Sequence, residues 1–135
     1  SDAGSNTIFQ NIKNFAKSHN FVRIFPSLPR SDFLCLIKNC GVLVGNSSSG
    51  LIEASYFGTS VVNIGTRQRG REKSNNVFDV KSGSVISIKH TISLALKKST
   101  KSSYLYGVGN TSQKIVQRLE KIKLNSELAE KQLAY

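Results

Sequence analysis

The feature that most constrains this chain is the alternation of short, solidly apolar runs with segments of helical periodicity. Val42-Leu43-Val44 and the run 60–64 are too short for helices, and we expect both to be strands buried on both faces. Apolar residues recur at helical spacing in the segments around them, at about 5–18, 31–39, 51–57, 84–98 and 111–122. This alternation predicts an α/β fold, a Rossmann-like parallel sheet with helices on both faces.

Two further segments are predicted to be strands. The first is 21–25, which ends where Pro26 begins a break, and the second is 77–80. A length of 135 residues suits one core. We therefore expect one domain over 1–122 and a charged, helical tail over 123–135. Methionine is absent, even at position 1, so we expect the chain to be a piece of a longer polypeptide.

The chain is strongly basic, with 19 Lys and Arg against 8 Asp and Glu and a net charge of +11. Such a charge favours an anionic partner, which could be nucleic acid, acidic lipid or a phosphorylated small molecule. The lysines are scattered and not interleaved with aromatic residues, so we expect no nucleic acid partner. Apolar runs are too short to cross a bilayer and no signal peptide is visible, so we expect no membrane partner and a cytoplasmic location.

The cysteines and histidines lack the spacing of a metal site. Cys35 and Cys40 are five residues apart and would point to different faces of a helix, while His19 and His90 lie far away. We expect two buried, reduced thiols and no metal or cofactor.

A run of small residues follows the first buried strand. Asn46, Ser47, Ser48 and Ser49 lie between two glycines, directly before a predicted helix. Backbone N–H groups at a helix start, glycines that permit close approach and three hydroxyls together suit the phosphates of a nucleotide. The alternative is a simple helix cap, which would explain one serine but not three.

Glu53 lies in the first turn of the predicted helix that follows. A carboxylate there is stabilised by the helix dipole, so capping is one interpretation. The other is that Glu53 accepts hydrogen bonds from the two hydroxyls of a ribose, one turn beyond the phosphate site.

The loop 65–72 follows the next strand and contains Arg67, Arg69 and Arg71. Since parallel strands have their carboxyl ends at one sheet edge, this loop should face the same crevice as the serines. Guanidinium groups suit phosphate binding, although a solvated basic loop remains the alternative.

The segment GNSSSGLIEASYFGTSVVNIGTRQRGRE at 45–72 resembles the UDP-N-acetylglucosamine 2-epimerase family, especially its hydrolysing branch. SDAGS at the start and LYGVGN further on are also similar to that family. The resemblance extends to about residue 122. It implies a GT-B-type enzyme with two Rossmann-like domains, of which this chain would be the carboxyl-terminal, UDP-binding half.

The resemblance also implies site residues. The serines that contact the UDP diphosphate fall on Ser47 and Ser48, the ribose-binding glutamate on Glu53 and the arginine of the GTRQ segment on Arg67. Asn46 and Ser49 belong to the same turn. A contact with uracil is expected at Ser27 and Leu28.

The chemistry implied is conversion of UDP-N-acetylglucosamine and water into N-acetylmannosamine and UDP. It proceeds by removal of the proton at C2, anti elimination of UDP and addition of water to a 2-acetamidoglucal. No catalytic residue of the family matches a position here, so the chain alone is expected to be inactive. The expected partners are UDP or the UDP-sugar, the amino-terminal domain of the same enzyme and further copies in a homo-oligomer.

Two alternatives stay open. Another GT-B enzyme, either a non-hydrolysing epimerase or a glycosyltransferase, would share the fold, although NIGTRQRGRE favours the hydrolysing branch. A basic nucleic-acid-binding module would show strongly salt-dependent binding.

Overall fold

The computed structural model describes residues 4–81 and 83–123 of the chain. They fall into two compact units, Ser1–Leu36 and Ile37–Tyr135, each of which is described by itself. In chain order, the helices are α1 (Ser5–Ser18), α2 (Arg30–Asn39), the 3₁₀ helix η1 (Ser48–Gly50), α3 (Glu53–Phe57), α4 (Val85–Lys97) and α5 (Thr111–Lys121). The strands are β1 (Leu43–Gly45), β2 (Val61–Ile64) and β3 (Val77–Val80).

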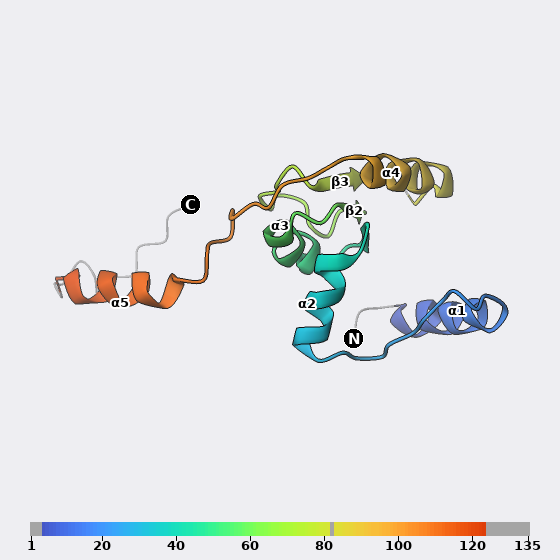
Figure 1. Ribbon diagram of the computed structural model, residues 1–135, viewed down its shortest axis with the longest axis horizontal. Coiled ribbons are helices and arrows are strands. Elements are labelled where there is room, and N and C mark those ends of the chain that lie inside the picture. The colour runs from blue at the N-terminus through green and yellow to red at the C-terminus, as the bar shows by residue number, and fades with distance from the viewer. Residues whose placement is uncertain (1–3, 82, 124–135) are drawn as a thin grey trace. The chain divides into compact units, whose positions relative to one another are not determined.

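The second unit is built on a parallel sheet with the strand order β1-β2-β3 (Figure 1). Leu43 of β1 is in register with Val61 of β2, which in turn pairs with Val77 of β3. Solid apolar runs became parallel strands because both faces of the sheet are covered by other elements. The predicted α/β, Rossmann-like fold is confirmed.

Helix α4 covers one face of the sheet. Ala95 of α4 packs with Val62 of β2 and Val80 of β3 in a buried apolar cluster. The helix begins after Ser84, whose hydroxyl accepts a hydrogen bond from the backbone N–H of Ser87. This serine satisfies one of the N–H groups that a helix start leaves without an intrahelical partner.

The turn around η1 lies against the opposite face. Gly50 is buried, and a Cβ added there would stand 2.8 Å from Cγ1 of Val61. Gly50 therefore has a packing reason, and close approach of a ligand is not needed to explain it. Gly58 ends α3 in the left-handed conformation with φ 72°, which glycine adopts without steric cost.

A buried polar network ties the start of β3 to the rest of the unit. Asn76 is 1% exposed; it accepts a hydrogen bond from the Ser55 hydroxyl at 3.0 Å and donates one to the Thr59 carbonyl at 2.7 Å. Its own carbonyl accepts from the N–H of Val61. Because every buried group of this side chain is satisfied, the network stabilises the unit rather than marking a site.

Two burial predictions were wrong. The first apolar run is half-buried rather than fully buried, and Val44 is 41% exposed, because β1 lies at an edge of the described sheet. Cys35 is exposed and Cys40 is half-buried, and both thiols are free.

The predicted strand 21–25 was also wrong, because this stretch of the first unit is irregular. A strand is held by backbone hydrogen bonds to a neighbouring strand. The described part of the first unit contains no strand with which 21–25 could pair. Aromatic rings pack at the end of α1. His19 stacks on Phe15 with 3.8 Å between the ring centroids, and Phe21 packs against His19 in an edge-to-face arrangement.

Helix α5 ends at Lys121, and the domain boundary at residue 122 remains a prediction. The helical tail predicted over 123–135 lies outside the described residues, apart from Lys123. No helix in the described ranges is long and apolar enough to span a membrane.

Candidate functional site

The serine turn at the carboxyl end of β1 forms a tight local structure. Ser47 caps η1: its hydroxyl accepts a hydrogen bond from the N–H of Ser49 at 3.3 Å and lies at the same distance from the Ser49 hydroxyl. Ser47 is exposed, whereas Ser48 and Ser49 are half-buried. The capping interpretation thus holds for Ser47, and the turn presents hydroxyls at the edge of the sheet where parallel α/β folds bind ligands.

Glu53 stands in the first turn of α3, as predicted. It is half-buried, and it interacts with a neighbouring group rather than standing free in solvent. Glu53 thus lies three residues after the end of η1.

Gln68 joins the serine turn to the basic loop. Its side-chain amide donates a hydrogen bond to the Asn46 carbonyl at 2.7 Å, across 22 positions of sequence. Gln68 is only 3% exposed, and its Oε1 is buried with no hydrogen-bond partner among the described residues. The structure thus brings Asn46 and the loop that carries Arg67 together.

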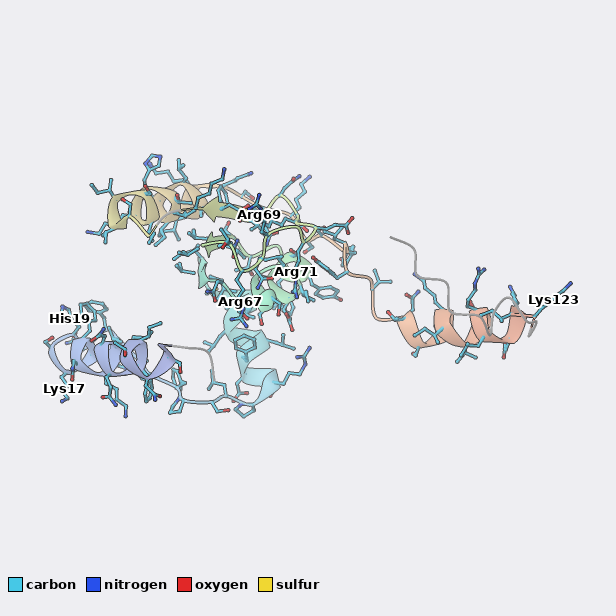
Figure 2. The ribbon with its side chains drawn as sticks, turned by 180° about the vertical axis from the view of Figure 1, so that it is seen from behind. Lys17, His19, Arg67, Arg69, Arg71 and Lys123 are labelled. Atoms are coloured by element: carbon cyan, nitrogen blue, oxygen red, sulfur yellow. The ribbon has the colours of Figure 1, made fainter. Side chains whose placement is uncertain are left out.

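The arginines of that loop differ in their surroundings. Figure 2 shows Arg67, Arg69 and Arg71 on the loop that follows β2, and all three are exposed. Arg67 interacts with another group of the protein, whereas Arg69 lines a cavity between the ends of β2 and β3. Phosphate binding by these arginines remains a prediction.

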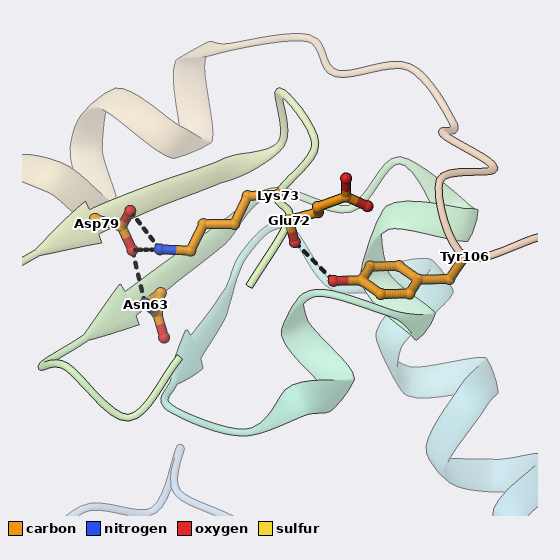
Figure 3. Close-up of polar contacts among 5 residues, drawn as sticks. All are labelled: Asn63, Glu72, Lys73, Asp79 and Tyr106. Atoms are coloured by element: carbon orange, nitrogen blue, oxygen red, sulfur yellow. Dashed lines mark hydrogen bonds and ion pairs between the residues drawn. The ribbon is translucent and has the colours of Figure 1, made fainter. Parts of the chain in front are cut away.

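An ion pair fixes the far side of the loop (Figure 3). The Lys73 ammonium donates to both carboxylate oxygens of Asp79, at 2.9 and 2.8 Å, and the amide of buried Asn63 donates to the same carboxylate at 2.7 Å. Burial by itself would raise the pKa of Asp79. The hydrogen bonds from Lys73 and Asn63, with the charges of Lys73 and Lys81, outweigh that effect and lower the pKa.

The connector after α4 reaches the same loop. The Tyr106 hydroxyl donates to the Glu72 carbonyl at 2.7 Å, as Figure 3 shows. Tyr106 lies in the LYGVGN segment, which is similar in sequence to the epimerase family. The hydrogen bond from Tyr106 therefore holds this segment against the loop that follows β2.

Ser27 and Leu28 belong to the first unit, in the irregular segment before α2; Ser27 is exposed and Leu28 half-buried. Their contact with uracil remains a prediction. Sequence reasoning missed Gln68, Lys73, Asp79 and Lys81 as residues of interest. A neutral amide within a run of cations was the one visible signal for Gln68.

The fold defines a Rossmann-like α/β domain, with polar and basic side chains in the turns that follow β1 and β2. The sequence pattern of the UDP-N-acetylglucosamine 2-epimerase family matches residues 1–120, and the chain belongs to that family. It is 41% identical to the UDP-N,N'-diacetylbacillosamine 2-epimerase (hydrolyzing) of Legionella pneumophila subsp. pneumophila, over 100% of this chain and 36% of that protein.

Two other relatives match part of the chain. The polysialic acid biosynthesis protein P7 of Escherichia coli is 45% identical over 58% of this chain and 20% of its own length. The UDP-N-acetylglucosamine 2-epimerase of Neisseria meningitidis serogroup B is 35% identical over 57% of this chain and 20% of its own length. The chain thus spans about a third or less of the length of these curated relatives.

Proposed function

We propose that this chain is the carboxyl-terminal, UDP-binding part of a hydrolysing 2-epimerase. The whole enzyme would convert a UDP-linked 2-acetamido sugar and water into the 2-epimeric free sugar and UDP. The observation that carries the proposal is the 2.7 Å hydrogen bond from Gln68 to the Asn46 carbonyl. It holds the serine turn and the Arg67 loop together at the ligand edge of a domain that belongs to the epimerase family.

In this proposal each residue binds one part of UDP. Ser47 and Ser48, with Asn46 and Ser49 in the same turn, donate to the diphosphate, and Glu53 accepts from the ribose hydroxyls. Arg67 supplies a guanidinium to the nucleotide. The exposure of Ser47 and Arg67 and the position of Glu53 one short helix further on support this assignment.

Catalysis is assigned to groups outside this chain. Proton removal at C2 and departure of UDP need acids and bases on the sugar side of the site, and we place these in an amino-terminal domain. This chain alone should bind UDP weakly and should not turn over. Cytoplasmic location and assembly into a homo-oligomer belong to the same proposal.

The sugar is the open part of the proposal. UDP-N-acetylglucosamine is the substrate that the family resemblance favours. UDP-N,N'-diacetylbacillosamine is a second candidate, because the Legionella relative named for this sugar matches the whole chain. Assays that measure the release of UDP from each UDP-sugar by the whole enzyme decide between the two substrates.

UDP binding tests the proposal itself. Calorimetry on the whole protein should show that Glu53→Ala weakens UDP binding by about 1–3 kcal/mol, the scale for hydrogen bonds to a charged group. Glu120→Ala, which removes an exposed acid of α5, serves as the control and should leave affinity unchanged. Equal UDP affinity in both variants would remove Glu53 from the ribose site.

Arg67→Lys should also weaken UDP binding, because a point charge does not replace a planar fork. Arg71→Lys makes the same replacement four residues along the same loop and should have no effect. A wild-type protein that binds no UDP at all would refute the proposed function.

A further inference from the structure

A basic hollow lies at the carboxyl ends of β2 and β3. It has a volume of about 280 Å³ and is lined by Gly65, Thr66, Arg69, Lys73, Asp79 and Lys81. The proposed function assigns no contact with UDP to any of these six residues. We call it the β2–β3 pocket.

The charges of this pocket do not cancel. Asp79 is neutralised by Lys73, which holds both of its carboxylate oxygens, and one of these oxygens also accepts from Asn63. No side-chain hydrogen bond or salt bridge joins Arg69 or Lys81 to another residue within 4–81 and 83–123. Two positive charges are therefore left without a direct partner at the wall of one hollow.

The ion pair also explains how the pocket stays open to an anion. A free carboxylate at Asp79 would repel an anion and would attract Arg69 or Lys81 into the hollow. With its oxygens engaged by Lys73 and Asn63, Asp79 instead acts as a fixed, neutralised wall (Figure 3). Both Arg69 and Lys81 are exposed, so a ligand can reach them from solvent.

We propose that the β2–β3 pocket binds a phosphate group through Arg69 and Lys81. A phosphate ester carries about −1.5 to −2 charges at neutral pH, which matches the two unneutralised cations. A guanidinium fork and an ammonium are the two groups that bind phosphate most often, and the Thr66 hydroxyl adds a third donor. A hollow of this size suits one small ligand or one end of a larger one.

The phosphate could come from two sources: the diphosphate of a bound UDP-sugar, or a separate phosphorylated molecule. The proposal is independent of the proposed function, because it needs only the pocket and its charges.

Calorimetric titration of the whole protein with inorganic phosphate at low ionic strength tests the pocket. Wild-type protein should bind phosphate saturably, and Arg69→Gln/Lys81→Gln should bind at least about tenfold more weakly. Lys89→Gln/Lys97→Gln, which removes two charges from exposed positions on α4, should stay within about twofold of wild type. Equal losses in the two double variants would overturn the proposal, and so would wild-type affinity in the pocket variant.

A charge-retaining exchange separates charge from folding. Arg69→Lys/Lys81→Arg keeps one guanidinium and one ammonium at the wall of the pocket and should retain phosphate affinity within about threefold. If this exchange abolishes binding as completely as the glutamine variant does, charge is not what holds phosphate and the proposal fails.

Repeating the titration with saturating UDP assigns the source. Competition between UDP and phosphate supports the pocket as a site for the nucleotide's own phosphate. Undiminished phosphate binding supports the pocket as a site for a separate ligand. A protein that binds phosphate through Arg69 and Lys81 but binds no UDP would uphold this proposal while refuting the proposed function.

Discussion

Gln68 offers the sharpest test of how the candidate site is held together. Replacing it with methionine keeps the volume of the side chain and removes both ends of the amide. The hydrogen bond to the Asn46 carbonyl, 2.7 Å long, is lost, and so is the buried Oε1 that has no described partner.

The two losses act in opposite directions on stability. Losing the hydrogen bond to the carbonyl of exposed Asn46 costs about 0.5–1.5 kcal/mol, and removing a buried, unpartnered acceptor returns a similar amount. We therefore expect Gln68→Met to change the free energy of unfolding by less than about 1 kcal/mol.

UDP affinity should respond differently. Without the bond, the serine turn and the Arg67 loop are no longer held in one arrangement, and binding must restore it. A net hydrogen-bond contribution of about 1 kcal/mol corresponds to about a fivefold weaker UDP complex. Calorimetry with UDP and urea unfolding on the same preparation provide both numbers.

Gln68→Ala is the matched comparison, since it removes the same bond and also leaves a cavity, so it should lose stability as well as affinity. UDP affinity within twofold of wild type in Gln68→Met would refute the reasoning. A loss of affinity that merely tracks a loss of stability would refute it too.

Three further predictions concern stability and reactivity. Asn76→Ala strands two buried hydrogen-bond partners and should lower the free energy of unfolding by about 2–5 kcal/mol in urea; a loss below about 1 kcal/mol would show that water replaces them. Because the pKa of Asp79 is lowered from 3.8, its pairing with Lys73 stabilises the fold above that pH and is lost as the pH falls through the lower folded value. Acid unfolding of Asp79→Asn should therefore show a weaker dependence on pH below about 4 than wild type, and equal curves would contradict this. Burial raises the pKa of the Cys40 thiol, although backbone hydrogen bonds at Cys40 and Val42 act to lower it. Iodoacetamide should therefore label the exposed Cys35 first. Mass spectrometry that finds Cys40 labelled first would contradict this prediction.

The helices and the strands β2 and β3 could be predicted from the sequence because their signals are local. The segment 84–98 shows an apolar period and a serine cap, and it became α4 (Val85–Lys97). The run that became β2 (Val61–Ile64) is apolar throughout apart from Asn63, and its first three residues are buried. Local pattern is sufficient where the element's own residues decide its conformation.

Features that depend on distant partners were missed for the same reason. The segment 21–25 has strand composition, but strands also need a neighbour, and periodicity does not supply one. The exposure of Val44 follows from the order of strands in the sheet, which no single run of residues encodes. Gln68 meets its partner 22 positions away, so its role became visible only once the turns were placed in space.

The contact between Gly50 and Val61 has a consequence for how this site can vary between proteins. Position 50 cannot gain even a methyl group unless the residue opposite it on the strand becomes smaller, since added carbon would stand 2.8 Å from a valine methyl. The two positions should therefore change as a compensating pair, and an alanine at 50 should be tolerated when 61 is also alanine. The conformation of the serine-containing turn would then depend on an apolar contact between position 50 and position 61.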